Sequence, residues 1–426
     1  MIQRVKGTRD ILPPQSRLWA AVESEALRVF SGFGYDEIRL PALEPTELFV
    51  RGVGEGTDIV AKEMYTFTDR KGRSLTLRPE GTAGVARAFI ENSLTQWPQP
   101  VRLLYMGPMF RYEKMQRGRF RQFSQIGIEL LGAATPEADV EVLLALHTFL
   151  GALAFDEAVI LLNNLGDPDD RPRFIATLKA ELAPNRSRLC EDCQRRFETN
   201  PLRILDCKEP SCQQLVAATT PVEESVSEES RQHVTQVEKG LSSLGIPVRR
   251  APRLVRGLDY YLRTVFEVVV PALGEDTAVC GGGRYDRLIA DLGGPQVPGI
   301  GFAIGEDRLV EVLDAPFRKR VLDRRLVALI PLGEEPSRRC LQLARSLVEN
   351  GISCQVEVTG RSLKAGLKWA AKMEAAVAVI VGESELAAGT ATVRDFARAE
   401  QTQVALAEVV GRVASLLGAS KSGGAS

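Results

Sequence analysis

Histidine is scarce in this 426-residue sequence, which contains only His147 and His233. With two histidines, a Ser-His-Asp catalytic triad or a two-histidine metal site is very hard to build. Long apolar runs are also missing, because the longest one, AAVAVIV over residues 375–381, is far too short to span a bilayer. The first residues lack the apolar core of a secretory signal peptide. We therefore expect a cytoplasmic protein whose chemistry depends on carboxylates, arginines, backbone groups or a metal.

Common nucleotide-binding signatures are absent as well. The sequence has no GxxxxGK[ST] loop, and GVGEGT at residues 52–57 is too short for a dinucleotide-binding fingerprint. PGIGFAIG at residues 298–305 is typical of a buried strand interrupted by glycine. These absences disfavour a P-loop ATPase and a Rossmann dehydrogenase.

The composition is that of an ordinary globular protein. Hydrophobic residues make up 44% of the chain, charged residues 26%, and the formal net charge is −1. These values exclude disordered, collagen-like and disulfide-scaffold classes. The 12 lysines are far outnumbered by 42 arginines. This bias favours binding of phosphate or carboxylate groups, which the planar guanidinium matches better than an ammonium does.

Apolar periodicity divides the chain into several regions. A helical pattern over residues 17–32 is followed by short apolar segments separated by glycine or charged turns, which favours antiparallel hairpins. We further predict a helix over 136–150 and a charged, mainly helical insertion over 167–245. A strand region follows from 254, and a glycine turn at 281–283 leads into a helix. The chain then forms an alternating strand–helix unit, whose helices include 362–372 and 404–417. The predicted boundaries are 1–166 and 246–320 for one interrupted domain, 167–245 for the insertion, 325–420 for the α/β domain, and 421–426 for a disordered tail.

Basic residues are densest in GPMFRYEKMQRGRFRQF, which contains Arg111, Lys114, Arg117, Arg119 and Arg121. Strand parity allows the arginines at 111, 119 and 121 to share one face of a hairpin that turns at the glycine. Such a cluster suits a polyphosphate or a nucleic-acid backbone. The alternative is an ordinary solvated hairpin.

Five segments, in this order, carry a family resemblance: LTLRPEGTAGVARA, VRLLYMGPMFRYEKMQRGRFRQFSQIGIELLG, LVRGLDYYLRTVFEVV, GGGRYDRL and PGIGFAIGEDRL. The chain resembles the histidyl-tRNA synthetases, a family of class II aminoacyl-tRNA synthetases, over nearly its whole length. LVRGLDYY and GGGRYD are specific to the histidine branch, whereas the arginine-bearing motif 2 and GFAIGEDRL, motif 3, are shared more widely. The resemblance implies an α+β catalytic domain with a six-stranded antiparallel sheet, and a C-terminal α/β anticodon-binding domain. It also implies a homodimer whose interface involves motif 1, in the N-terminal helix and the strand that ends at Pro41.

The implied reaction joins L-histidine and ATP, as its Mg²⁺ complex, into histidyl-adenylate, and then transfers histidine to the 3′ end of histidine tRNA. A substrate carboxylate attacks the α-phosphate, so the step needs alignment and charge stabilisation rather than a histidine base. By resemblance, Arg111 and Arg256 contact the α-phosphate from opposite sides, Arg119 and Arg308 hold the outer phosphates, and Glu113 lies near the adenine. The alternative for Arg256 is a structural salt bridge with Asp259.

The resemblance also implies a histidine-binding pocket. Glu80, Thr82 and Gln125 match the residues that bind the α-amino group, Glu129 and Tyr261 match those that read the imidazole nitrogens, and Tyr285 belongs to the loop that lines this pocket. Histidine requires such a set, because its ammonium needs acceptors and its ring needs matched polar partners. Taken alone, each tyrosine is more typical of a core aromatic residue. The chain departs from the family at Ser124, where histidine is frequent.

Two other functions remain as alternatives. One is the histidine-sensing, catalytically silent regulatory subunit of ATP phosphoribosyltransferase, which resembles the synthetase catalytic domain. The arginines at 111, 119, 256 and 308 argue against it, as does the unit after residue 325, which that regulatory family generally lacks. The other is a pure nucleic-acid-binding module, for which an amino-acid pocket would have no purpose.

Seven cysteines are too few, and odd in number, for a disulfide framework in this chain. Cys190, Cys193, Cys207 and Cys212 form two pairs separated by 13 residues. Four thiolates with this spacing can form a tetrahedral structural zinc site. Reduced metal-free thiols and a redox pair are the alternatives, and the resemblance does not decide, since members of the family differ here. Because these cysteines are distant in sequence from the arginines, we expect zinc to support stability rather than chemistry.

The other three cysteines, Cys280, Cys340 and Cys354, lie in apolar contexts, and we expect them to be small buried hydrophobic residues. In the C-terminal unit, Arg361, Lys364, Lys368 and Lys372 have spacings that group them on one helical face. That face suits tRNA phosphates, with a solvated helix surface as the alternative.

Overall fold

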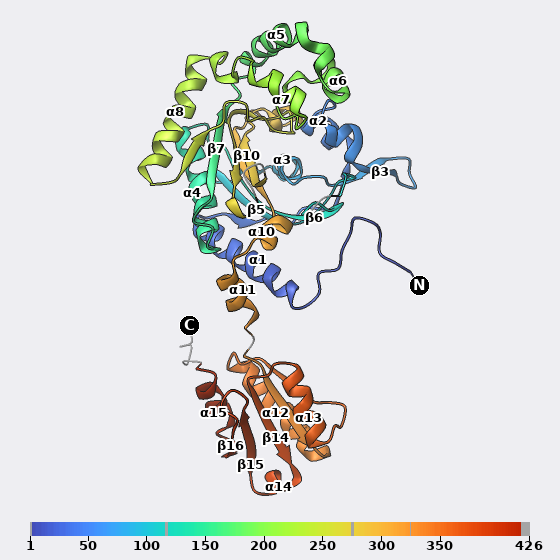
Figure 1. Ribbon diagram of the computed structural model, residues 1–426, viewed down its shortest axis with the longest axis vertical. Coiled ribbons are helices and arrows are strands. Elements are labelled where there is room, and N and C mark those ends of the chain that lie inside the picture. The colour runs from blue at the N-terminus through green and yellow to red at the C-terminus, as the bar shows by residue number, and fades with distance from the viewer. Residues whose placement is uncertain (1, 116–117, 274–276, 324, 419–426) are drawn as a thin grey trace. The chain divides into compact units, whose positions relative to one another are not determined.

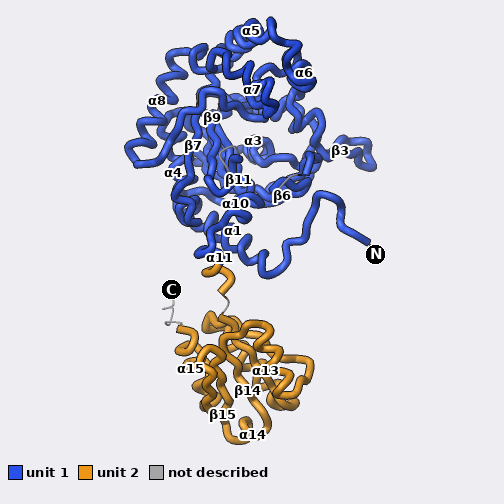
Figure 2. The backbone as a smooth tube through the Cα atoms, viewed as in Figure 1, with its two compact units in different colours: residues 1–318 blue, residues 319–426 orange. Residues whose placement is uncertain are grey.

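The computed structural model describes residues 2–115, 118–273, 277–323 and 325–418. The chain forms two compact units, residues 1–318 and 319–426 (Figure 2). The tail predicted over 421–426 and Arg117 of the basic cluster lie outside the described residues. Within the described ranges, no helix combines the length and apolar character needed to cross a membrane.

An eight-stranded sheet forms the centre of the first unit (Figure 1). In spatial order its strands are β1 (Asp36–Glu37), β5 (Val101–Phe110), β6 (Gln122–Leu131), β11 (Gly299–Gly305), β10 (Ala278–Arg284), β9 (Leu262–Val269), β7 (Val159–Asn164) and β8 (Val248–Arg250). The six strands from β5 to β7 pair antiparallel, which confirms the expected core sheet. Two short strands, β1 and β8, extend it by parallel pairing at each edge.

Helices cover one face of this sheet because their apolar residues recur every three or four positions. In α1 (Gln15–Gly32), the buried side chains include Leu18, Val22, Ala26 and Val29. Phe30 of this helix contacts Phe149 of α4 (Pro136–Ala152) and Phe302 of β11, so both helices pack against the sheet. The helices predicted at 17–32 and 136–150 are therefore present, with slightly wider bounds.

The opposite face of the sheet holds a second cluster of buried residues. Tyr105, Tyr261 and Tyr285 pack there with Phe89 of α3 (Thr82–Glu91). Beside this cluster lies a small antiparallel sheet with α2 and a π-helical turn. The bounds of these elements are β2 (Leu43–Pro45), α2 (Thr46–Val53), η1 (Ile59–Glu63), β3 (Tyr65–Thr68) and β4 (Ser74–Leu77). The remaining short elements, which lie elsewhere in the unit and at its C-terminal end, are η2 (Leu94–Gln96), η6 (Pro271–Leu273), α9 (Leu288–Asp291), α10 (Glu306–Glu311) and α11 (Ala315–Leu322).

The glycines at 281–283 lie inside strand β10, and our prediction of a glycine turn there was wrong. Close packing explains the run of glycines. A Cβ on Gly282 would lie 2.2 Å from the carbonyl oxygen of Gly301, and one on Gly281 would lie 2.2 Å from a guanidinium nitrogen of Arg256. Real Cβ atoms do not approach other atoms this closely, so a side chain at Gly282 would clash with backbone, and one at Gly281 would require the Arg256 guanidinium to move. The bare strand surface thus makes room for the Arg256 side chain.

Residues 167–245 are mainly helical and have a small core of their own. The elements are α5 (Asp170–Leu182), η3 (Ala183–Arg188), α6 (Glu191–Thr199), η4 (Pro201–Ile204), α7 (Pro210–Ala217), η5 (Val222–Glu224) and α8 (Glu228–Ser243). Phe174, Leu178, Ile204 and two of the clustered cysteines, Cys193 and Cys212, are buried together in that core. In Figure 1, α5, α6 and α7 lie together at one end of the first unit.

The second unit is a five-stranded sheet with helices, in the order β13-β12-β14-β15-β16. Its elements are β12 (Val327–Leu332), α12 (Glu334–Glu349), β13 (Cys354–Val356), α13 (Leu363–Lys372), β14 (Val377–Gly382), α14 (Glu383–Ala387), β15 (Thr390–Asp395), β16 (Glu400–Ala405) and α15 (Val409–Leu416). The first three strands are parallel, and β15 and β16 are antiparallel additions. The predicted alternation of strands and helices is present.

Two predictions in this unit were wrong. The last helix was expected over 404–417, but Val404 and Ala405 end the edge strand β16, and the helix begins only at Val409. Arg361 lies before α13 rather than on it. Its guanidinium pairs with the buried Glu357 at 2.7 Å and lies over the Trp369 ring. Only the three lysines at 364, 368 and 372 therefore remain on α13.

Candidate active site

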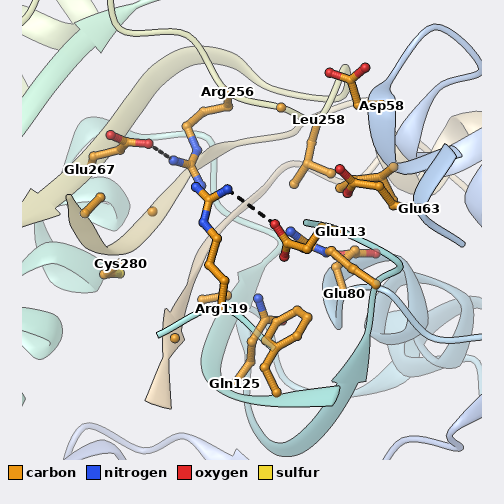
Figure 3. A pocket seen from close by; sticks show the side chains of 18 of the residues that line it. Asp58, Glu63, Glu80, Glu113, Arg119, Gln125, Arg256, Leu258, Glu267 and Cys280 are labelled. Atoms are coloured by element: carbon orange, nitrogen blue, oxygen red, sulfur yellow. Dashed lines mark hydrogen bonds and ion pairs between the residues drawn. The ribbon is translucent and has the colours of Figure 1, made fainter. Parts of the chain in front are cut away.

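A cavity of about 340 Å³ opens in the first unit, beside strands β6, β9, β10 and β11. Residues within 58–63, 80–82, 111–113, 118–120, 203–206 and 255–261 complete its wall. Most of the predicted site residues line it together, namely Glu80, Thr82, Arg111, Glu113, Arg119, Gln125, Arg256, Tyr261 and Arg308 (Figure 3). The cavity is thus rich in arginines and carboxylates, which suits a charged ligand that carries both signs.

Two of the cavity arginines are held by backbone carbonyls. Arg111 follows β5 and donates from Nε to the carbonyl of Pro79 at 2.8 Å, with its guanidinium over the Phe123 ring. Arg308, in the first turn of α10, donates from Nη1 to the carbonyl of Ala278 at 2.7 Å. Burial, together with the nearby charge of Arg119, lowers the Arg308 pKa from its ordinary value. Neutral carbonyls orient both side chains without neutralising their charge.

Two further arginines of the cavity wall pair with carboxylates. Arg119 lies 3.3 Å from Glu113, and Arg256 forms an ion pair with Glu267 of β9 (Figure 3). Burial opposes the charge on Arg256, but Glu267 and its other neighbours outweigh this, so its pKa lies above the ordinary value. Asp259, the partner considered from the sequence, instead contacts Arg171 and Asn200. The salt bridge between Arg256 and Asp259, which the sequence left as an alternative, is not formed, and Glu267 is the carboxylate that pairs with Arg256.

The basic cluster of the hairpin does not act as one surface. Arg111 and Arg119 line the cavity, but Arg121 stacks over the Tyr112 ring, with its guanidinium carbon 3.7 Å from the ring centre. The backbone N–H of Arg121 donates to Gly7 at 2.8 Å. Strand parity alone had placed Arg121 with the other two. The N-terminal segment, which crosses the hairpin here, draws Arg121 away from them.

A buried set of polar groups lies at the inner end of the cavity. The Glu80 carboxylate accepts from the backbone N–H groups of Thr82 and Ala83 at 2.7 and 2.9 Å. Thr82 donates from its hydroxyl to Glu129 at 2.7 Å, and the Tyr285 hydroxyl donates to the other Glu129 oxygen. Glu129 and Tyr285 are buried just behind the lining residues. Glu129 and Tyr285 are therefore accessible only to the part of a ligand that lies at the inner end of the cavity.

Titration in this region is strongly shifted. Burial raises the pKa of Glu129 to about 8, and the hydrogen bonds from Tyr285 and Thr82 only partly oppose this. Burial also raises the pKa of Tyr261 to about 12. Gln125 is buried, and its Oε1 has no hydrogen-bond partner among the described residues. Perturbed and unpaired polar groups that gather in one cavity are typical of a ligand site.

Sequence reasoning missed the part played by Arg9. Its guanidinium pairs with Asp307 at 2.6 Å and stacks over the Phe120 ring. The other Asp307 oxygen accepts from the backbone N–H of Ser124 at 2.8 Å, at the position where the chain departs from the family. The N-terminal segment thereby connects the hairpin to the start of α10. Arg9 and Asp307 are 298 positions apart, so no local spacing could have shown the contact.

The four clustered cysteines come together in space. Their sulfur atoms all lie within 4.8 Å of one another, and those of Cys190 and Cys207 are 3.8 Å apart. Zn–S bonds of about 2.3 Å place sulfurs about 3.8 Å apart across a tetrahedron, so the spacing fits zinc. Although the cysteines are distant in sequence from the motif arginines, the fold brings the cluster close to the cavity, because Asp206, next to Cys207, lines it.

The remaining cysteines differ in environment. Cys280 lines the cavity although it is 3% exposed, and burial raises its thiol pKa. Cys340 is fully buried in the core of the second unit, while Cys354 is only partly buried there. The expectation of small buried side chains thus holds for Cys280 and Cys340, and in part for Cys354.

Comparison with known proteins gives consistent results over the whole chain. Residues 7–309 match the family model of histidyl-tRNA synthetase, and residues 326–416 match that of an anticodon-binding domain. A histidine–tRNA ligase of Desulfitobacterium hafniense is 45% identical over 95% of this chain and 96% of its own length. One from an Anaeromyxobacter species is 47% identical over 97% and 99%.

The solved structures agree with the sequence comparison. The apo histidyl-tRNA synthetase of S. aureus superposes with a TM-score of 0.80 and 33% identity, covering 97% of this chain and all of that one. The match covers both compact units and agrees with the fold described above. The chain therefore belongs to the histidyl-tRNA synthetase family.

Proposed function

We propose that the cavity beside β6, β9, β10 and β11 is the site where histidine and ATP react, within the histidine–tRNA ligase activity that the family carries. The observation that supports this most is the meeting of Arg111, Arg119, Arg256 and Arg308 with a buried polar pocket in one cavity. A polyphosphate needs the first group of residues, and an amino acid needs the second. The product histidyl-adenylate would be transferred to the 3′ end of histidine tRNA.

Arg111 and Arg256 are proposed to bind the α-phosphate from two sides. Arg119 and Arg308 would hold the outer phosphates, and Glu113 the adenine. The histidine carboxylate attacks the α-phosphorus, the bond to the bridging oxygen breaks, and pyrophosphate leaves. The added negative charge falls on the phosphate oxygens, where preorganised guanidinium groups are most effective. Mg²⁺ enters with ATP, and carboxylate oxygens of Glu63 and Glu267 on the cavity wall are of the donor type that it prefers.

Histidine is proposed to bind at the inner end of the cavity. Glu80, Thr82 and Gln125 would take the ammonium group, and the unpaired Oε1 of Gln125 is a free acceptor for it. Glu129 and Tyr261 would read the two imidazole nitrogens. Tyr285 would act through Glu129, to which its hydroxyl donates. Because Glu129 is fully buried, a ring without a matching nitrogen loses its own hydrogen bond to Glu129 in a pocket that water does not reach, which gives selectivity for histidine.

Histidine-dependent ATP–pyrophosphate exchange tests this proposal directly. A synthetase carries it out, whereas a histidine-sensing regulatory subunit of ATP phosphoribosyltransferase binds histidine without exchange, and a nucleic-acid-binding module does neither. The regulatory alternative is less supported, because relatives named histidine–tRNA ligase align over nearly the whole chain. Exchange driven equally by other amino acids would contradict the assigned pocket.

A homodimer is also proposed, with motif 1 at its interface. Leu43 of β2 and Phe67 of β3 are each 45% exposed on the small sheet. Exposed apolar side chains of this kind are common at subunit contacts. We propose a cytoplasmic location as well, as expected from the sequence. Sedimentation of the purified chain at twice its monomer mass tests the dimer.

The second unit is proposed to bind the anticodon arm of histidine tRNA. A chain that ends at residue 325 should keep histidine-dependent exchange but lose about tenfold or more in the rate of tRNA charging, because backbone contacts supply much of nucleic-acid affinity. Charging by the full chain should weaken as salt is raised, and Lys364→Ala with Lys368→Ala should reduce that salt dependence. The control is the oligomeric state of the truncated chain. A truncated enzyme of unchanged assembly that charges tRNA as well as the full chain would contradict this role.

Zinc is proposed to occupy the four-cysteine site in the purified protein. We expect close to one zinc per chain after dialysis against metal-free buffer, because tetrahedral thiolate sites hold zinc tightly. Elemental analysis measures the stoichiometry. Cys212→Ser should lower it, while Cys340→Ser, which changes a buried cysteine of the second unit, should not. Full activity at a stoichiometry near zero would favour plain thiols.

A further inference from the structure

The four-cysteine site lies behind one wall of the cavity. Cys190 caps the start of helix α6, and Cys193 lies in its first turn. Cys207 directly follows Asp206, which lines the cavity, and Arg203 of the short helix η4 lines it too. The 13 residues between the two cysteine pairs therefore run from the sulfur cluster to the cavity and back.

The first contact between this segment and the cavity wall is made at Asp58. Arg196 of α6 pairs with the Asp58 carboxylate at 2.7 Å, and Arg203 lies 3.8 Å from the same oxygen. Both guanidinium groups are largely shielded from water, with 19% and 15% of their side chains exposed. Asp58 itself lines the cavity, just before the π-helical turn η1. Partly buried pairs of this kind orient the groups they join more firmly than surface pairs do.

The second contact is made at Asp259. Asn200 donates from Nδ2 to the Asp259 carboxylate at 3.0 and 3.3 Å, and Arg171 pairs with it at 3.2 Å. On its other side, the Asp259 backbone N–H donates to Val53 at 3.1 Å. Asp259 lies within the loop whose Tyr261 lines the cavity. The loop is thus held between the cysteine-bearing segment and residues 53–58.

We propose that zinc bound by the four cysteines positions this wall of the cavity and thereby sets the affinity for histidine. The inference rests on the proposed function of the cavity. One ion holding both cysteine pairs fixes the two ends of the segment that carries Arg196, Asn200 and Arg203. With its ends fixed, the segment holds Asp58 and Asp259 in place. Asp58 then fixes the cavity wall at residues 58–63, and Asp259 fixes the loop that carries Tyr261 of the histidine pocket. When the ion is lost, the ends separate and both contacts loosen.

The test compares full-length protein with and without zinc. Hydrogen exchange should become faster over residues 53–63 and 256–262 when zinc is stripped, while exchange in the second unit stays unchanged. The Kd for histidine, measured by calorimetry, should rise about threefold to tenfold, the range typical of coupling through packed contacts. Restoring zinc should reverse both changes. A chain that binds no zinc, or unchanged exchange in both loops after stripping, would overturn the proposal.

A pair of neighbouring substitutions on α6 covers the case in which stripped protein unfolds. Arg196→Ala leaves all four cysteines intact, yet removes the Asp58 contact, so the protein should keep its zinc and still show faster exchange over 53–63. Glu198→Ala is the control on the same helix, because Glu198 is exposed and, among the described residues, pairs with Lys179 and Arg186 rather than with residues 53–63. Equal exchange in the two variants would overturn the proposal. Failure of the proposed function would appear separately, as no histidine-dependent pyrophosphate exchange by zinc-loaded wild-type protein.

Discussion

Replacing Arg256 by alanine should slow histidine-dependent ATP–pyrophosphate exchange by about 10²–10³-fold, the usual effect of removing one preorganised charge next to a reacting centre. The side chain lies across the bare surface of Gly281 and is oriented by Glu267, so its position is set before any ligand arrives. Its Nε has no partner among the described residues and is free for a ligand oxygen. The rate of exchange and the thermal midpoint are the two measurements, and the midpoint should change little.

Arg256→Lys should restore only part of the lost rate, because an ammonium cannot make the two parallel contacts of a guanidinium. Arg287→Ala is the control, since Arg287 is an exposed arginine whose one ion pair among the described residues is with Asp291. It should leave exchange unchanged. Exchange near the wild-type rate in Arg256→Ala would show that the α-phosphate is bound by other groups.

Glu129→Gln should lower kcat/KM for histidine by roughly fivefold to 150-fold, because a buried partner of the imidazole is then mismatched. This factor corresponds to a loss of about 1–3 kcal/mol in transition-state stabilisation. Tyr261→Phe should act in the same direction. The KM for ATP should change less in both variants, since neither side chain is assigned to the phosphates. Both rates can be obtained from exchange assays with one substrate varied at a time. Wild-type kcat/KM in both variants would mean that the imidazole binds elsewhere.

The same substitution should also change the pH dependence of stability. The Glu129 pKa is raised from 4.5 to about 8 in the folded protein, so the folded state retains a proton that the unfolded chain loses near pH 4.5. As the pH rises from about 4.5 to 8, the wild type therefore loses stability at this residue. Glutamine does not titrate, so the thermal midpoint of Glu129→Gln relative to wild type should increase between pH 5 and pH 8.5. A constant difference across this range would contradict the raised pKa.

Much of the fold could be predicted from local patterns in the sequence. The first helix follows from its apolar spacing, and the long β5–β6 hairpin follows from alternation on either side of a charged turn. The edge strand β16 was missed because its sequence EQTQVA is mostly polar and exposed, and it is defined by pairing with β15. Edge pairing of this kind leaves almost no periodic signal.

The site was predicted less completely, for reasons that are physical. The residues that line the cavity are carried by motifs, and nine of the predicted residues do meet there. What binds each of them could not be read from the sequence. Arg256 pairs with Glu267 on the next strand rather than with Asp259 three positions away, and Arg9 contacts Asp307 from the other end of the unit. Such partners are set by strand register and chain crossing, which spacing along the sequence does not encode.

The glycines of β10 extend the functional site to residues that have no side chain. A methyl group at Gly281 would occupy the space of the Arg256 guanidinium, so Gly281→Ala would displace the arginine without removing any polar atom. Random mutagenesis scored for loss of growth would then report this position as strongly as the arginine itself. A survey restricted to polar or charged positions would pass over it. Intolerance to substitution at Gly281 would therefore report the space that the Arg256 guanidinium occupies, whereas intolerance at Gly282 and Gly283 would report the close packing of the neighbouring strands.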